Sequence, residues 1–241
     1  MMSPSRGARS TVFVVDNDSS TRDALSTLMR SVGLYAETFA IGDEFLYGGK
    51  SDNPGCLVLE VRLPGIGGLD LQRRLADARN RIPIIFLTAH GDVAMAVRAM
   101  KAGAVDFLTK PFRDQDVLDA IHMALERDQI RRERDATIAI TRQRFAFLTT
   151  REQEVVRMVT SGMLNKQISV QMGISENTVK VHRSRAMHKM QARSLSDLVK
   201  IYGCLETAVV PSVFSLPSAL FPVLIPGHET HVVRSMGENH A

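Results

Sequence analysis

The chain of 241 residues has no tryptophan and only two cysteines, Cys56 and Cys204. The cysteines form no CxxC pair, which excludes a disulfide-rich scaffold and a zinc site built on cysteines. The first ten residues are polar and lack the apolar core of a signal peptide. These absences favour a protein of the reducing cytoplasm.

Motifs that mark common enzyme classes are also missing. The sequence contains neither a glycine-rich phosphate loop nor a Gly-x-Ser-x-Gly nucleophile elbow. An enzyme is therefore disfavoured. Hydrophobic residues make up 44% of the chain and charged residues 23%, which excludes wholesale disorder.

Positive charge is concentrated towards the C-terminal half. The net charge is −2 over residues 1–128, +3 over 129–147, +5 over 148–203 and −2 over 204–241. This distribution indicates contact with nucleic acid through the basic part. A solvated basic helix surface would give the same count.

The first half of the chain alternates two patterns. Short apolar runs rich in β-branched residues predict strands buried on both faces, and segments with helical spacing lie between them. This alternation predicts an α/β fold with a doubly wound, five-stranded parallel sheet. We expect strands at 11–15, 34–38, 56–59, 83–87 and 105–108, and helices at 22–32, 69–78 and 93–100.

Polar side chains follow four of these predicted strands. Asp16 and Asn17 follow the first, and Glu60, Thr88 and Lys110 follow three later ones. Ligands of doubly wound sheets bind at the carboxyl ends of the strands. The sequence therefore predicts that these side chains form one site.

Three stretches carry a resemblance to a known family: VFVVDND, CLVLEVRLPGIGGLDLQ and IPIIFLTAHGDVAMAVRAMKAGAVDFLTKPF. Residues 11–127 resemble the receiver domain of two-component response regulators of the FixJ/NarL type, which has a flavodoxin-like fold. The resemblance implies that Asp16 helps to bind Mg²⁺, that Thr88 and Lys110 contact a phosphoryl group, and that Phe107 reports the state of the domain. It also implies a cis bond between Lys110 and Pro111.

Two positions depart from the family pattern. Glu60 occupies the place of the aspartate that accepts a phosphoryl group from a histidine kinase, and Asn17 replaces the second acid that binds Mg²⁺. Asn17 offers only a neutral carbonyl, and Mg²⁺ favours carboxylates. The longer Glu60 misplaces a nucleophile whose position is critical. We therefore expect no metal cofactor, or weak Mg²⁺ binding at Asp16.

Two interpretations of Glu60 stay open. Its carboxylate, bound by Thr88 and Lys110, would put negative charge near the phosphoryl position and favour an active-like state. Alternatively, the pocket is inert and the domain serves only as a dimerisation scaffold. Glu60 supplies one charge where a phosphate supplies nearly two.

Beyond the predicted sheet the pattern becomes entirely helical. Helical spacing over residues 113–135 runs into a charged stretch, which predicts a helical linker over 128–146. A capping box, Thr149 with Glu152 or Thr150 with Gln153, begins the next helix. A second helix begins at Asn165, Gly173 makes a turn, and Ser175 caps a third.

Residues 147–203 resemble a LuxR-type helix-turn-helix domain of four helices, through the string LTTREQEV…NKQIS…MGISENTVKVHRSRAMHKMQARS. The resemblance implies base contacts from Lys180, Val181 and Ser184, with Arg183 near them. Lys166, Thr178, Arg185 and Lys189 are the candidates for phosphate contacts. The last helix, near Leu195 to Tyr202, resembles the dimerisation helix of the family.

We therefore divide the chain into a receiver (1–127), a linker (128–146), a helix-turn-helix domain (147–203) and a tail (204–241). In the tail, residues 208–226 are uncharged and apolar, but four prolines argue against a membrane-spanning helix. We expect a cytoplasmic homodimer that binds double-stranded DNA and regulates transcription without phosphorylation. The alternatives are a regulator phosphorylated by a histidine kinase, and a protein that titrates another response regulator by forming heterodimers with it.

Overall fold

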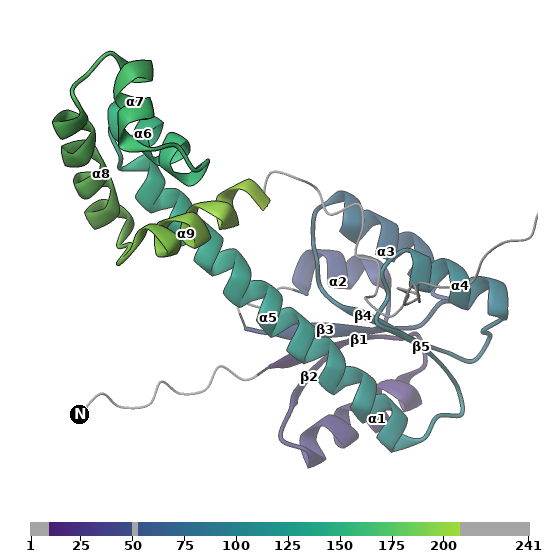
Figure 1. The fold of residues 1–241 in the computed structure, drawn as a ribbon. Helices are drawn as coiled ribbons and strands as arrows, with labels where there is room; N and C mark the ends of the chain where they lie inside the picture. Colours follow the sequence, from purple (N-terminus) through teal and green to yellow (C-terminus); the bar gives the residue numbers. More distant parts are fainter. Residues whose placement is uncertain (1–9, 50–52, 208–241) are drawn as a thin grey trace, which may run out of the picture.

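The computed structural model describes residues 10–49 and 53–207 (Figure 1). The first part is a five-stranded parallel sheet in the order β2-β1-β3-β4-β5, which confirms the predicted doubly wound arrangement. The chain order reverses between β1 and β3, so the carboxyl ends of these two strands border the crevice where ligands of such sheets bind. The strands are β1 (Thr11–Val15), β2 (Tyr35–Phe39), β3 (Gly55–Leu59), β4 (Ile84–Thr88) and β5 (Asp106–Thr109).

Helices cover both faces of this sheet, which explains why the three central strands, β1, β3 and β4, are buried along their whole length. On one face, Val12 and Val14 of β1 pack with α1 (Ser19–Ser31) and the first part of α5 (Asp114–Ala146). On the other face, Phe13 and Val15 pack with α2 (Gly42–Gly48), α3 (Gly68–Asp77) and α4 (Val93–Lys101). The sequence did not predict α2, a short helix whose N-cap, Ile41, has no side-chain oxygen to mark its start.

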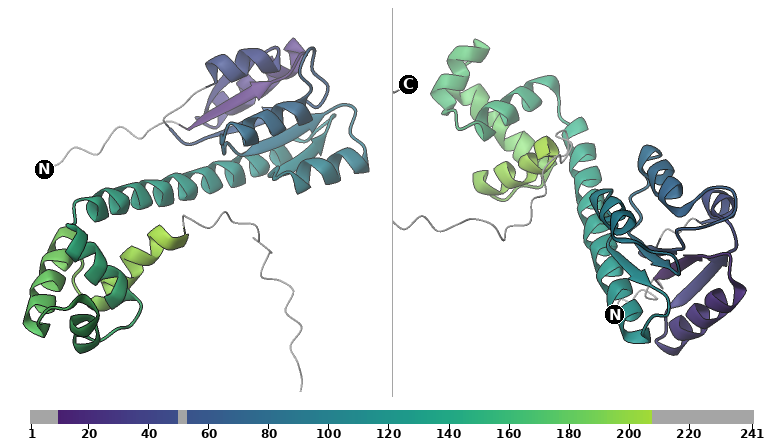
Figure 2. Two further views of the ribbon diagram at one scale, coloured as in Figure 1. Left: turned by 90° about the horizontal axis from the view of Figure 1, so that it is seen from above. Right: turned by 90° about the vertical axis from the view of Figure 1, so that its right-hand side faces the viewer.

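The 33-residue helix α5 joins the two halves of the molecule (Figure 2). Its N-terminal part packs on the sheet, and its C-terminal part extends to the second domain. The predicted linker over 128–146 is thus the continuation of the last receiver helix. At the boundary, the buried carboxylate of Asp128 accepts a hydrogen bond from the backbone N–H of Gly55 at 3.0 Å and forms ion pairs with Arg131 and Arg132.

The second domain consists of four helices around its own apolar core. Thr149 and Glu152 form the capping box of the first, so of the two predicted capping pairs this one is present. Gly173 has a left-handed backbone (φ 64°), and Ser175 caps the third helix, as predicted. The helices are α6 (Thr150–Thr160), α7 (Asn165–Met172), α8 (Glu176–Met190) and α9 (Leu195–Thr207).

Two predictions concern the end of the chain. The final helix was expected near Leu195 to Tyr202, but α9 continues to Thr207. The apolar segment 208–226 lies outside the described residues. Within the described part, no helix is both long enough and apolar enough to cross a membrane.

Candidate functional site

The carboxyl edge of the sheet brings four of the predicted side chains together. Asp16 follows β1, Glu60 follows β3, Thr88 ends β4 and Lys110 follows β5. The Lys110 Nζ atom lies 2.6 Å from Asp16 Oδ2 and 3.1 Å from Glu60 Oε2. The peptide bond between Lys110 and Pro111 is cis, as the family resemblance implied.

The Glu60 carboxylate is held on both oxygens. Oε1 accepts hydrogen bonds from the Thr88 hydroxyl at 2.5 Å and from the backbone N–H of Arg62 at 3.1 Å, and Oε2 faces the Lys110 ammonium. The side chain is 5% exposed. Thr88 in turn accepts a hydrogen bond from the backbone N–H of His90 at 3.2 Å. The carboxylate is therefore fixed by a complete set of donors rather than free in solvent.

These contacts set the charge of the network. Burial opposes ionisation of Glu60, but the hydrogen bonds from Thr88, Arg62 and Lys110 outweigh it and lower the pKa of the carboxyl group. For Lys110, burial likewise opposes the charged form, while Asp16 and Glu60 outweigh it and raise the pKa of the ammonium group. Glu60 is thus an anion, and Lys110 a cation, at neutral pH.

Asn17 does not join this network. It is exposed, whereas Asp16 is buried. Asp18, the acidic residue just beyond, caps α1 by accepting from the backbone N–H groups of Ser20 and Thr21, and the hydroxyl of Thr21 is the main reason why its pKa is lowered.

The residues present do not fit a magnesium ion. Asp16 Oδ2 binds Lys110, and Oδ1 accepts from the backbone N–H of Asp18 at 2.9 Å. Both oxygens of Glu60 are engaged as well, so the Lys110 ammonium sits where two carboxylates would otherwise share a cation. Within residues 10–49 and 53–207, no three His, Cys, Asp or Glu side chains are grouped so as to hold a metal ion.

Phe107 lies beside this site and packs inward. Its ring centroid is 5.9 Å from that of Phe86, in the core on the α3 side of the sheet. Gly91 makes room for it, because a Cβ atom there would lie 2.7 Å from the Phe107 ring and 3.1 Å from the methyl group of Thr88. The absence of a side chain at 91 therefore permits the inward positions of both Thr88 and Phe107.

In the second domain, α8 presents a basic surface. Val179, Ala186 and Met190 face the core. The predicted base-contacting residues Lys180, Val181 and Ser184 are exposed on the same helix, and so is the phosphate candidate Arg185. Lys166 is exposed on α7, and Thr178 is half-buried beside the helix cap.

Two of the predicted DNA-contacting residues also have partners inside the domain. The Lys189 ammonium lies 2.6 Å from Glu152, a buried carboxylate of the capping box on α6. Burial raises the pKa of Glu152, but Lys189 and the Thr149 backbone N–H outweigh it, so that the net effect is to lower that pKa. The Arg183 guanidinium lies 3.4 Å from the Asn165 side chain. Sequence reasoning missed these partners.

Comparison with known proteins supports the family resemblance of both halves of the chain. Residues 12–122 match the family model of the response regulator receiver domain, and residues 146–202 match that of bacterial regulatory proteins of the luxR family. The chain belongs to the response regulators with a LuxR-type DNA-binding domain.

Individual response regulators are similar over most of the chain. Nodulation protein W of Bradyrhizobium diazoefficiens is 52% identical over 79% of this chain and 84% of its own. The transcriptional regulatory protein FixJ of the same organism is 38% identical over 79% of this chain and 93% of its own. The solved structure of the response regulator StyR is 47% identical, covers 81% of this chain and 99% of its own, and has a TM-score of 0.73.

Membership in this family assigns the roles of the two halves. The sheet domain is a receiver, and α6 to α9 form a domain of the kind that binds DNA. The chain is therefore a transcription factor of the response-regulator type, as the sequence predicted.

Proposed function

We propose that this response regulator binds DNA and regulates transcription without phosphorylation, because Glu60 occupies the phosphoryl position with a permanent charge. One observation carries the proposal: the Glu60 carboxylate already binds the Thr88 hydroxyl and the Lys110 ammonium, the two groups that the family uses for phosphoryl oxygens. A third donor, the backbone N–H of Arg62, completes the set.

The surroundings of Glu60 support an active-like state over an inert pocket. Thr88 is turned towards the carboxylate, and Phe107 packs inward over Gly91. A carboxylate that had lost its role would be expected to extend to solvent, since burying it costs free energy unless it is fully bonded. Here every oxygen has a partner, so the burial is compensated.

A phosphodonor experiment tests this proposal directly. Full-length protein is incubated with a small phosphodonor and Mg²⁺, and the intact mass is measured. We expect no stable adduct, because every carboxylate oxygen of Asp16 and Glu60 already has a partner within the protein. A stable gain of about 80 Da at Glu60 would contradict the proposal and favour regulation by a histidine kinase.

For DNA recognition we propose the contacts implied by the family, with double-stranded DNA bound by a homodimer in the cytoplasm. Lys180, Val181 and Ser184 would meet base edges, and Lys166, Thr178 and Arg185 would meet phosphates. Lys189 is bound to Glu152, so its loss would weaken the packing of α6 on α8 as well as any phosphate contact.

Arg185 gives the clearest test of a phosphate contact. We expect Arg185→Ala to weaken binding to all DNA sequences alike and to reduce the slope of log affinity against log salt by about 1. The measurement is a fluorescence anisotropy titration at several salt concentrations. Arg74→Ala, an equal change on an exposed residue of α3, should leave the slope unchanged. An unchanged slope for Arg185→Ala would exclude this contact.

A further inference from the structure

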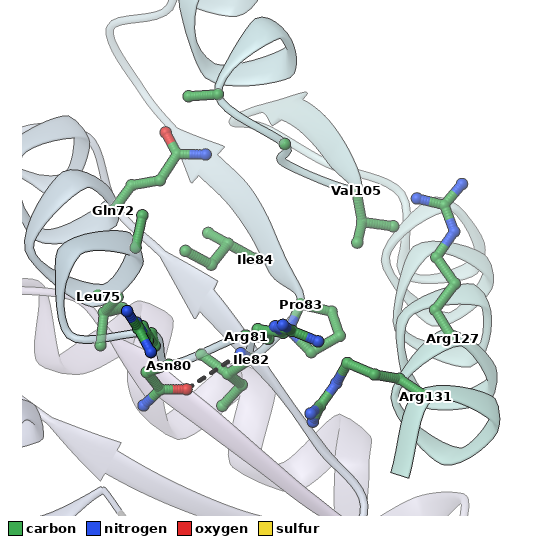
Figure 3. A pocket seen from close by; sticks show the side chains of 14 residues that line it. Gln72, Leu75, Asn80, Arg81, Ile82, Pro83, Ile84, Val105, Arg127 and Arg131 are labelled. Carbon is green, nitrogen blue, oxygen red and sulfur yellow. Dashed lines mark hydrogen bonds between the residues drawn. The ribbon is translucent and has the colours of Figure 1, made fainter. Parts of the chain in front are cut away.

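A cavity of about 440 Å³ lies at the amino edge of the sheet, on the opposite side from Glu60 (Figure 3). It is bounded by the end of α3, the loop that leads into β4, the turn before β5, and α5. Part of its wall is apolar and is formed by Leu75, Ile82, Pro83, Ile84 and Val105. The proposed function uses none of these residues.

Four arginines line this cavity: Arg79, Arg81, Arg127 and Arg131. Of the described residues that form its lining, none carries a carboxylate. Figure 3 shows Arg127 and Arg131 projecting from α5, and Arg81 beside Pro83 in the loop before β4. The lining therefore contains four arginines and no acidic residue beside an apolar wall.

The bonding of these arginines leaves donors available. Arg131 is held by Asp128 and Asp135, which fixes its guanidinium in place. Arg81 reaches Asp135 only at 3.8 Å. The guanidinium groups of Arg79 and Arg127 form no hydrogen bond or ion pair within residues 10–49 and 53–207. Arg79 and Arg127 are both exposed, so their donors are available to a ligand.

The four arginines of the lining are additional to the basic residues in the last turns of the neighbouring helices. The C-terminal ends of α3 and α4 open near the cavity, and their exposed carbonyl groups favour nearby cations. Those ends already carry basic residues in their last turns, Arg74 on α3 and Arg98 with Lys101 on α4. In addition, Arg79 has a left-handed backbone (φ 55°), at a position that favours glycine.

We propose that this cavity binds a small phosphate-bearing ligand of the size of a mononucleotide. Arginine forks match phosphate oxygens in pairs, and guanidinium planes also stack on flat rings. The apolar wall suits a ring that carries little charge, and the volume falls within the range of about 300–1,000 Å³ typical of small-molecule sites. This inference does not depend on the role of Glu60.

Calorimetric titration of the full-length protein tests the proposal, with adenosine 5′-monophosphate, ribose 5-phosphate and inorganic phosphate as probes. We expect the nucleotide to bind with a Kd between about 10 µM and 1 mM. Ribose 5-phosphate should bind at least about tenfold more weakly, since it lacks the ring, and phosphate more weakly still.

Two double variants separate this cavity from other basic surfaces. Arg81→Gln with Arg127→Gln should weaken nucleotide binding at least about tenfold. Arg134→Gln with Arg142→Gln, an equal loss of charge on exposed positions of α5 outside the cavity, should not change it. Absence of saturable binding below about 5 mM would overturn the proposal. Equal binding by both double variants, or equal binding of ribose 5-phosphate and the nucleotide, would do so as well.

Discussion

Glu60→Gln should lower the affinity of the untreated full-length protein for its specific DNA sites at least about tenfold. An amide has one acceptor oxygen where the carboxylate uses two, so at least one of three donors loses its bond: the Thr88 hydroxyl, the Arg62 N–H or the Lys110 ammonium. In the proposed function this network favours the active-like state that binds DNA, so a weaker network lowers the affinity for DNA. A hydrogen bond to a charged group contributes about 1.5–3 kcal/mol, and a loss of about 1.4 kcal/mol weakens binding about tenfold.

Two further variants make this result specific. Glu126→Gln, the same change on an exposed residue of α5, should bind DNA like the wild type. Glu60→Asp combined with Asn17→Asp should restore the acidic pattern of the family. Its DNA binding should then require a phosphodonor with Mg²⁺. If Glu60→Gln binds specific DNA as tightly as the wild type, the pocket is inert and the domain is only a scaffold for dimerisation.

Asp128→Ala should destabilise the receiver by about 3 kcal/mol, the lower end of the range for removing one partner of a buried ion pair. The Asp128 side chain is 1% exposed and serves the Gly55 N–H, Arg131 and Arg132 together. Its removal leaves the buried Gly55 N–H without its acceptor and takes a buried carboxylate away from Arg131 and Arg132. Because this carboxylate ties α5 to the start of β3, local opening should be greatest there.

Hydrogen exchange of the full-length chain measures this effect at the peptide that contains Gly55 and at the N-terminal half of α5. Asp135→Ala is the matched control, because Asp135 contacts Arg131 and Arg81 but is 45% exposed. A surface ion pair of this kind contributes about 0–1 kcal/mol. If both variants exchange alike, Asp128 does not anchor the helix.

Sequence patterns were sufficient to predict the sheet and the residues at its carboxyl edge. The central strands of a sheet covered on both faces are continuously apolar, so their ends are visible in the sequence, and Asp16, Glu60 and Thr88 each stand at the end of such a run. Lys110 follows β5, an edge strand with a weaker pattern. The helix α2 was missed because its start lacks a capping side chain and it spans only seven residues.

The internal partners of the charged residues could not be predicted in the same way. Asp128 and Gly55 are 73 positions apart, and Lys189 and Glu152 are 37 apart. Such pairs depend on tertiary packing, which leaves no periodic signal in the sequence. For Glu60, the contacts with Thr88 and Lys110 were expected from the family resemblance, and only the hydrogen bond from the backbone N–H of Arg62 was not.

The central claim is that the receiver with Glu60 already permits specific DNA binding. The most direct test is a selection of genomic fragments by the untreated full-length protein, at physiological salt and without Mg²⁺ or a phosphodonor. The account predicts a sharp set of paired half-sites, as expected for a dimer. No enrichment by the full chain, with enrichment by residues 147–203 alone, would contradict the account and show that the receiver is inhibitory as it stands.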